Sequence, residues 1–288
     1  MKKILKYIIV IAILIFTTSC SKDRALEVHV IDVDQGDSTL IITPDKKSIL
    51  IDAGEDIYAR NVIRELKISG VNQIDIIVAT HFDKDHIGGM DKIINTFKIS
   101  NVFVPPGVVS HQDYYEFIGS CKNKGIKPFV INNYVSFKLG TETTIDFLSP
   151  IYSDIKYEIE SEITDSEEIN KNSIVFSLRC LGHKLIFTGD IDSEVEDSIL
   201  NLYNLENTSF LKVAHHGSKS STSENFIKEL TPKISSISCG YGNRYGHPHK
   251  ETLNTLNKYK SRIYRTDING NMTFYFTDKG IYSKEKYE

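Results

Sequence analysis

The 288-residue sequence has no tryptophan and no excess of basic residues, since 34 lysines and arginines stand against 38 aspartates and glutamates. Its formal net charge of −4 excludes binding of nucleic acid by bulk electrostatic attraction, so any basic surface must be local. Tyrosine (15) and phenylalanine (14) supply the aromatic bulk for a core. With 40% hydrophobic and 25% charged residues, the composition excludes a fibrous, collagen-like or mainly disordered chain.

Long hydrophobic runs are also scarce. After the basic segment Met1–Lys6, the apolar run Tyr7–Phe16 has only about ten residues, too few to span a bilayer and typical of a secretory signal. Small residues then lead to Cys20, and this end resembles a bacterial lipoprotein signal. We therefore expect residues 1–20 to be a signal peptide, Cys20 to be lipidated, and the remaining chain to be extracytoplasmic and anchored to the cell membrane. The alternative is an uncleaved anchor with a chance cysteine.

The remaining apolar residues form short β-branched runs that alternate with segments of helical spacing. The almost wholly apolar run Ile74–Ala79 indicates a strand covered on both faces. The other expected strands are Glu27–Val33, Thr39–Thr43, Ser48–Asp52, Asn101–Val104, Lys127–Ile131, Thr143–Leu148, Ser173–Cys180, Lys184–Thr188, Ser209–Val213, Ile234–Ser238, Arg262–Thr266 and Met272–Phe276. The expected helices are Ile57–Ile68, Met90–Phe97, Gln112–Asn123, Ser193–Tyr203, Ser223–Leu230 and Lys250–Tyr259.

This order of elements predicts an α/β fold in which two mixed sheets pack face to face with helices outside, an αββα sandwich. We expect residues 21–288 to form one such domain. The segment Ser153–Asn170 is rich in Glu, Asp and Ser, and it predicts a solvated acidic loop or insertion within that domain.

The segment Thr80–Gly89 carries the strongest chemical signal, because four potential metal ligands crowd the loop between a buried strand and a helix. If the segment is extended, His81, Asp83 and Asp85 face the same way, with His86 turning in behind them. Ionisable groups so close together are costly unless a cation neutralises them. The alternative is a polar loop in which Asp85 caps the next helix.

Further acids and imidazoles follow other expected strands. Asp190 ends the run Phe187–Asp190, and a histidine pair lies in Ala214–Ser218. Asp32–Asp37 and Ile51–Gly54 also put acids at strand ends. Each could be structural: Asp190, for example, could cap the helix from Ser193. Together they predict functional groups on loops at one edge of the sandwich.

In their order, these motifs resemble the metallo-β-lactamase-fold hydrolases, and most closely the extracytoplasmic hydrolase domain of the ComEC competence (DNA-uptake) family. The resemblance covers nearly all of the chain after the leader but only the hydrolase domain of that family, so it implies no role in DNA transport. The motifs that carry it are Asp32–Asp37, Ile51–Gly54, Thr80–Gly89, Asn172-Ser173, Thr188–Asp190, His215–Ser218 and Gly246–His249.

The resemblance implies two divalent metal ions. His81 and Asp83 would bind one ion, and Asp190 would bridge both. The ligands implied for the second ion are Asp85, His86 and His215, with His216 as the alternative because spacing cannot separate adjacent histidines.

Two positions depart from the common hydrolytic pattern. Asp83 replaces a histidine, and Asn172 stands where a third-motif histidine would be, as a weak ligand or none. The first site is therefore richer in oxygen, which shifts its preference from zinc towards harder ions such as manganese. The expected cofactors are two zinc or manganese ions.

The implied mechanism is hydrolysis by a metal-bound hydroxide. Two ions about 4 Å apart lower the pKa of a bridging water and stabilise charge on the attacked phosphoryl or carbonyl group. Asp85 could orient the hydroxide as well as bind metal. Asp34 and Asp52 are expected to hold the ligand histidines in the right tautomer.

The Gly-rich loop Gly240–His249 supplies the substrate signals. Cationic and hydrogen-bonding groups beside a dimetal centre suit a phosphodiester, with His247 as a candidate proton donor to the leaving oxygen. The alternative is an ordinary surface loop. The candidate phosphate contacts are Ser218, Arg244, Tyr245 and His249.

The leading hypothesis is a membrane-tethered dimetal phosphodiesterase or nuclease that acts on DNA. A second hypothesis has the same centre cleaving a cell-envelope phosphodiester of the teichoic-acid type, or a small ester, and the acidic charge favours it. A third, of another class, is a non-catalytic metal-binding lipoprotein. None of them requires an obligate protein partner.

Overall fold

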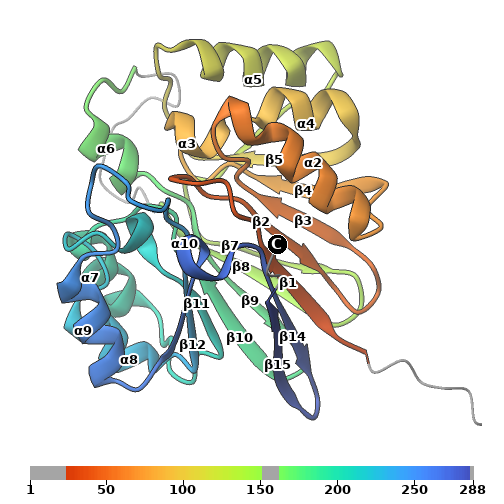
Figure 1. Cartoon of the computed structure of the whole chain (residues 1–288). Coiled ribbons are helices and arrows are strands. Elements are labelled where there is room, and N and C mark those ends of the chain that lie inside the picture. The colour runs from red at the N-terminus through yellow and green to blue at the C-terminus, as the bar shows by residue number, and fades with distance from the viewer. Residues whose placement is uncertain (1–23, 151–161, 286–288) are drawn as a thin grey trace, which may run out of the picture.

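The computed structural model describes residues 24–150 and 162–285, and its two β-sheets pack face to face with helices on both outer faces (Figure 1). The predicted leader with Cys20 lies outside the described residues, as does half of the predicted acidic loop. Among the residues described, no helix combines the length and the apolar character needed to cross a membrane.

The first sheet has eight strands and is antiparallel at one side and parallel at the other. Their order is β15 (Gly280–Glu285), β14 (Met272–Thr277), β1 (Leu26–Val30), β2 (Thr39–Ile42), β3 (Ser48–Ile51), β4 (Gln73–Val78), β5 (Lys98–Val104) and β6 (Phe129–Val130). The second sheet is also mixed, with the order β13 (Arg262–Arg265), β12 (Ile234–Ile237), β11 (Phe210–Lys212), β10 (His183–Phe187), β9 (Val175–Cys180), β8 (Thr143–Ser149) and β7 (Val135–Leu139).

The helices flank the sheets in two groups (Figure 1). Those beside the first sheet are η1 (Asp56–Tyr58), α2 (Ala59–Ile68), α3 (Lys84–Ile87), α4 (Met90–Thr96) and α5 (Gln112–Asn123). Those of the second half are α6 (Ser166–Lys171), α7 (Ser193–Leu202), η2 (Ala214–Gly217), α8 (Glu224–Leu230), α9 (Lys250–Lys258) and α10 (Thr266–Asn269).

Three apolar clusters correspond to the three interfaces between these four layers. Successive residues of β4 point to opposite faces, so Ile77 packs under α2 and α4 while Ile76 faces the second sheet. Phe147 and Phe176 belong to the cluster between the sheets. Phe226 of α8 belongs to the cluster outside the second sheet. Both faces of each sheet are therefore covered, which explains why their strands read as continuous apolar runs.

The predicted αββα class is confirmed, with differences at sheet edges and in the acidic segment. The edge strands β7 and β15 were not predicted, because Val135–Leu139 and Gly280–Glu285 carry polar and exposed residues that resemble loops. The predicted loop is wrong at its end, because residues 166–170 belong to the helix α6 (Ser166–Lys171). Asp165 starts that helix by accepting a hydrogen bond from the backbone N–H of Glu167.

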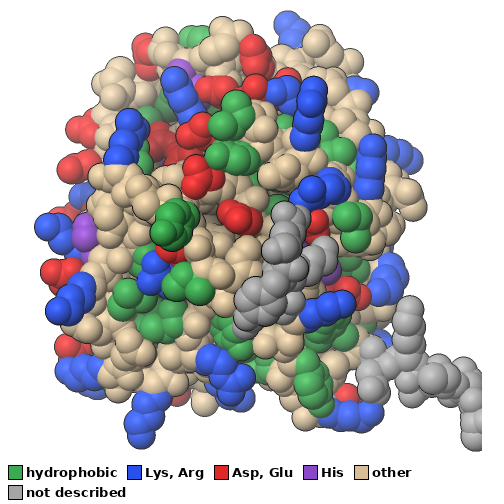
Figure 2. All heavy atoms as spheres, in the orientation of Figure 1, with side chains coloured by type: hydrophobic (Ala, Val, Ile, Leu, Met, Phe, Trp, Pro, Cys, Tyr) green, Lys and Arg blue, Asp and Glu red, His purple; other side chains and the backbone are tan. Residues whose placement is uncertain are grey.

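Charged side chains are unevenly distributed on the face shown in Figure 2. Acidic side chains gather in its upper central part, over α3 and the loop that follows β1. Lysine and arginine side chains are scattered around that area and form no continuous basic stripe on this face (Figure 2). The view agrees with the formal net charge of −4, which excludes bulk attraction of nucleic acid.

Candidate metal centre

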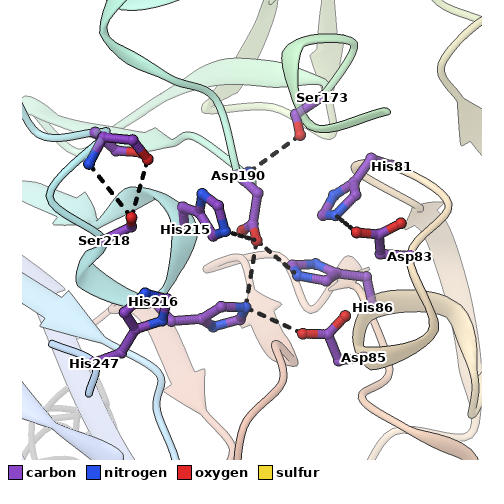
Figure 3. A network of polar contacts seen from close by, with 12 residues as sticks. His81, Asp83, Asp85, His86, Ser173, Asp190, His215, His216, Ser218 and His247 are labelled. Atoms are coloured by element: carbon purple, nitrogen blue, oxygen red, sulfur yellow. Dashed lines mark hydrogen bonds and ion pairs between the residues drawn. The ribbon is translucent and has the colours of Figure 1, made fainter. Parts of the chain in front are cut away.

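The acids and imidazoles that the sequence singled out meet at one edge of the sandwich, between the two sheets (Figure 3). The strand β4 leads into the segment His81–His86, β10 leads to Asp190, and β11 leads into the histidine pair in η2. The side chains brought together are His81, Asp83, Asp85, His86, Asp190, His215 and His216.

The local conformation of the segment His81–His86 differs from the extended one that was expected. Asp83 is extended but is the N-cap of α3, which starts at Lys84, so Asp85 lies in the first helical turn. The prediction that Asp85 converges with the others by strand alternation is therefore wrong, as is the alternative that Asp85 is the cap. Gly88 allows the tight packing, because a Cβ there would lie 2.6 Å from the backbone N of Asp56.

Asp190 stands at the centre of the cluster. Its Oδ2 atom lies 3.4 Å from Nε2 of His86 and 3.3 Å from Nε2 of His216. Nε2 of His216 is also 3.3 Å from Oδ2 of Asp85. Asp190 does not cap α7, because Asp192 accepts the N–H groups at the start of that helix. The carboxylate of Asp190 is therefore available to face the imidazoles.

The potential ligand atoms form three groups that share His86, and the atoms of each group lie within 4.8 Å of one another. His81, His86 and Asp190 make the first group, and Asp85, His86 and His216 make the second. Asp83 stands beside the first group, with its Oδ2 atom 3.8 Å from Nε2 of His81. A third group is His86, Asp37 and Asp52.

Buried hydrogen bonds fix the orientation of two of the imidazoles. Nδ1 of His86 lies 2.8 Å from a carboxylate oxygen of Asp52. Asp52 also accepts from the backbone N–H and the hydroxyl of Thr80, at 2.8 and 2.7 Å. The Thr80 oxygen in turn is 3.1 Å from Nδ1 of His81. Since Asp52 is an acceptor and the Thr80 hydroxyl already donates to it, Nδ1 of each histidine is the donor and Nε2 faces the cluster.

His216 is oriented in the same way by the second sheet. Its Nδ1 atom lies 3.0 Å from the carbonyl oxygen of Ser238, just after β12. Its backbone has the left-handed conformation with φ 52°, as does His215 with φ 48°. The two neighbouring side chains consequently diverge: His216 is buried, whereas His215 is partly exposed and its Nε2 is 4.0 Å from Asp190.

Four buried atoms of the cluster have no hydrogen-bond partner of acceptable geometry among the described residues: Nε2 of His81, His86 and His216, and Oδ1 of Asp190. Buried polar atoms without a well-formed hydrogen bond are costly, and here three imidazole nitrogens and a carboxylate converge. Imidazole nitrogen and carboxylate oxygen are ligands for zinc and related divalent ions. The donor set therefore fits divalent cations.

Burial and the charges of neighbouring residues shift the pKa values of these groups strongly. Burial lowers the pKa of His216, but Asp190 and Asp85 outweigh it and raise that pKa to about 10. Burial raises the pKa of Asp190, yet the neighbouring imidazoles hold it well below its usual value. Burial, followed by the charge of Asp85, raises the pKa of Asp83 to about 6. Burial lowers the pKa of His81 to about 3.

Of the two acids expected to orient the ligand histidines, Asp52 contacts one of them and Asp34 contacts a tyrosine instead. Asp52 contacts His86, as expected of a group that sets its tautomer. Asp34 instead accepts a hydrogen bond from the hydroxyl of Tyr58, because its left-handed turn (φ 58°) directs it to the surface. Asn172 is buried at the end of α6. Ser173 beside it accepts the backbone N–H of Asp190.

The expected substrate residues lie on the outer side of the cluster. His247 is half-buried, with its ring stacked at 6.2 Å on that of His216. Burial, followed by the charge of His216, lowers the pKa of His247 to about 4, so this imidazole is neutral at pH 7. Ser218 bonds Ser220, and His249 accepts from the backbone N–H of Lys219.

A cavity of about 670 Å³ opens beside the cluster. Asp83 and Asp85 form one part of its lining, and the loop that contains Arg244 and Tyr245 forms another. The carboxylates of the candidate metal centre and two of the expected phosphate contacts therefore share one cavity.

A buried ion pair beneath the cluster was not predicted. Nζ of Lys212 lies 2.7 Å from Oδ1 of Asp37, and both side chains are only 6% exposed. Asp37 also donates its backbone N–H to the carbonyl oxygen of Asp85. The charged residue inside the apolar run Ser209–Val213 was the available signal, since lysine is almost never buried unless paired.

Comparison with curated proteins gives relatives from bacterial competence. ComE operon protein 3 of Bacillus subtilis (strain 168) is 31% identical, covering 92% of this chain and 35% of the relative. Competence protein ComA of Neisseria gonorrhoeae is 28% identical, covering 86% of this chain and 32% of the relative. The chain thus spans about a third of the length of these relatives. They agree with the ComEC-type resemblance of the motifs.

Solved structures share the fold. The metallo-beta-lactamase fold protein YhfI from Bacillus subtilis superimposes with a TM-score of 0.51 at 14% identity, covering 83% of this chain and 95% of YhfI. Zn(2+)-bound PqqB from Methylobacterium extorquens gives 0.51 at 10% identity, covering 86% and 99%. The family model of the metallo-beta-lactamase superfamily matches residues 31–241. The two-sheet architecture and this match together show that the chain belongs to the metallo-beta-lactamase superfamily.

Proposed function

We propose that this protein is a metal-dependent phosphodiesterase with two divalent ions, zinc or manganese. The observation that carries the proposal is the convergence of buried, unpaired Nε2 atoms on the carboxylate of Asp190. His81 and Asp83 would hold one ion, Asp85, His86 and His216 would hold the other, and Asp190 lies close enough to contribute to both. His216 is preferred to His215 because it is buried and closer to Asp190.

Divalent ions at such a centre generate a nucleophile from water at neutral pH and neutralise charge on the attacked group. The surrounding residues prepare the site for this chemistry. Asp52 keeps the lone pair of His86 directed into the cluster. Asp85 reaches both the cluster and the cavity, so its second oxygen is available to accept a hydrogen bond from the attacking water.

A phosphodiester is favoured over other substrates by the wall of the cavity. Lys84, between the two metal-centre aspartates, and Arg244 also line it and supply donors for phosphoryl oxygens. The replacement of a histidine by Asp83 makes the site richer in oxygen, which suits the harder ions. The name of one relative, competence protein ComA, refers to competence and also supports a nucleic-acid phosphodiester.

The test is a substrate panel with the leaderless protein loaded separately with zinc and with manganese. The panel contains a chromogenic phosphodiester, plasmid DNA, an oligonucleotide, a glycerol-phosphate polymer and a small carboxylic ester. We expect hydrolysis of phosphodiesters by the wild type and its loss in Asp190→Asn. The matched control is Asp192→Asn, which lies two residues away and keeps a residue type that caps α7 well. Turnover of none of the substrates by metal-loaded protein would support the non-catalytic alternative.

We also propose that the protein is exported and anchored through a lipid on Cys20. The basic, apolar and small-residue segments before Cys20 support this assignment. Mass spectrometry of the native N-terminus tests it: a diacylated Cys20 is expected, and an unmodified Met1 would reject the assignment.

A further inference from the structure

The loop that borders the cavity presents two tyrosine rings to solvent. Tyr241 is 87% exposed and Tyr245 is 51% exposed, and both line the cavity with Asp83 and Asp85. Large aromatic side chains bury much apolar area when they find a partner, so exposed rings at the rim of a functional cavity indicate ligand contact.

These rings project from a well-braced loop. The side-chain amide of Asn243 donates to the carbonyl oxygens of Gly240 and His247, and its oxygen accepts from the backbone N–H groups of Tyr245 and His247. Since one side chain ties together both ends of the loop, the backbone that carries the rings is braced.

The loop also packs against the loop that follows β1 and against one histidine of the metal centre. Gly240 donates its N–H to the side chain of Gln35 at 3.1 Å, and a Cβ at Gly240 would lie 2.1 Å from the carboxylate of Asp34. His247 stacks on both Tyr245 and His216, with centroids 5.6 and 6.2 Å apart. A series of parallel rings therefore runs from the buried metal-centre histidine to the exposed Tyr245.

Arg244 completes this surface. Its guanidinium carbon lies 4.9 Å from the centroid of the Tyr245 ring, and it donates a hydrogen bond to the Tyr245 hydroxyl at 2.7 Å. A guanidinium held beside a ring in this way keeps further N–H groups with which it can bind a phosphate.

We propose that Tyr241 and Tyr245, with Arg244, form a stacking subsite for an unpaired nucleobase next to the scissile phosphodiester. The inference rests on the proposed function and narrows its substrate to nucleotides or strands with unstacked bases. Acidic groups of the cavity, Asp34 and Glu55, oppose a long phosphate backbone. Stacking supplies affinity that does not depend on bulk positive charge, at about tenfold per base.

The test measures stacking directly. A short oligonucleotide with hydrolysis-resistant phosphorothioate linkages and a central 2-aminopurine loses fluorescence when its base stacks. Because the chain has no tryptophan, no strong protein emission competes. Binding is titrated with zinc-loaded wild type, the double variant Tyr241→Ala/Tyr245→Ala, and the conservative pair Tyr241→Phe/Tyr245→Phe. Tyr282→Ala is the matched control, because this tyrosine is 55% exposed but lies on β15.

We expect the alanine pair to bind the probe at least tenfold more weakly, and the phenylalanine pair and Tyr282→Ala to bind like wild type. All variants should retain the metal content of wild type, which excludes damage to the metal centre. Equal binding by the alanine pair and wild type would overturn the inference, as would equal losses in the alanine and phenylalanine pairs. If the 2-aminopurine fluorescence is quenched only when the tyrosines are present, but the protein hydrolyses no diester, the proposed function is rejected and the stacking subsite is retained.

Discussion

The ammonium group of Lys212 connects the two sheets, because Lys212 ends β11 and its partner Asp37 lies in the loop after β1. Nζ lies 2.7 and 2.8 Å from the two carboxylate oxygens and 3.3 Å from the carbonyl oxygen of Val213. Replacing Lys212 with methionine retains the apolar bulk but leaves the Asp37 carboxylate buried without its cation. Removal of one partner from a buried ion pair costs about 3–5 kcal/mol. Such a loss is a large part of the roughly 5–15 kcal/mol that stabilises a typical protein.

Urea unfolding followed by far-ultraviolet circular dichroism measures this loss, since tryptophan fluorescence is not available. The double variant Asp37→Asn/Lys212→Met removes both charges and should recover part of the stability lost in Lys212→Met. Lys258→Met is the matched control, because Lys258 pairs with Glu224 while both side chains are 58% exposed. This control should change stability much less. If the free energy of unfolding of Lys212→Met is within about 1 kcal/mol of the wild-type value, the ion pair does not stabilise the fold as we argue.

Three other perturbations test the groups around the metal centre. Asp52→Asn should weaken divalent-ion binding by about 10- to 100-fold, because Asp52 orients His86; competition with a chromogenic chelator measures this, and unchanged affinity would contradict it. His216→Ala should lose bound metal while His215→Ala retains it, as measured by inductively coupled plasma mass spectrometry; the opposite pattern would exchange their roles. The chelator-treated protein should become less stable as pH rises from 6.5 to about 10. The pKa of His216 is raised from 6.5 to about 10 in the folded state, so its contribution is complete below pH 6.5 and is lost through this window. His81, with its pKa lowered to about 3, destabilises the fold as pH falls below 6.5. Thermal unfolding at several pH values with chelator checks both directions, and a melting temperature that increases from pH 6.5 to 10 would be contrary to this account.

The layers of the fold were predictable because apolar periodicity carries over directly into burial. Ile74–Ala79 was predicted to be a strand covered on both faces, and it forms β4 with neighbours on both sides. The strand β7 was not predictable in this way, since Val135 is exposed and the edge position imposes no apolar pattern. Edge strands are defined by their single neighbour, which is a long-range property of the chain.

The members of the metal centre were predictable, but their individual geometry was not. The sequence located His81, His86 and Asp190 because each follows a buried strand. The sequence could not separate His215 from His216. The left-handed backbone of both residues turns the His216 side chain inwards, and this conformation is not visible in the sequence. The Lys212–Asp37 pair was missed because it joins residues 175 positions apart in the chain.

The most direct test of the metal centre is anomalous X-ray diffraction from crystals grown separately with zinc and with manganese. We predict two peaks beside Asp190, one near His81 and the other near His86 and His216. Crystals in which the Asp190 carboxylate and the His216 imidazole contact no ion, while the ions bind elsewhere or not at all, would contradict it.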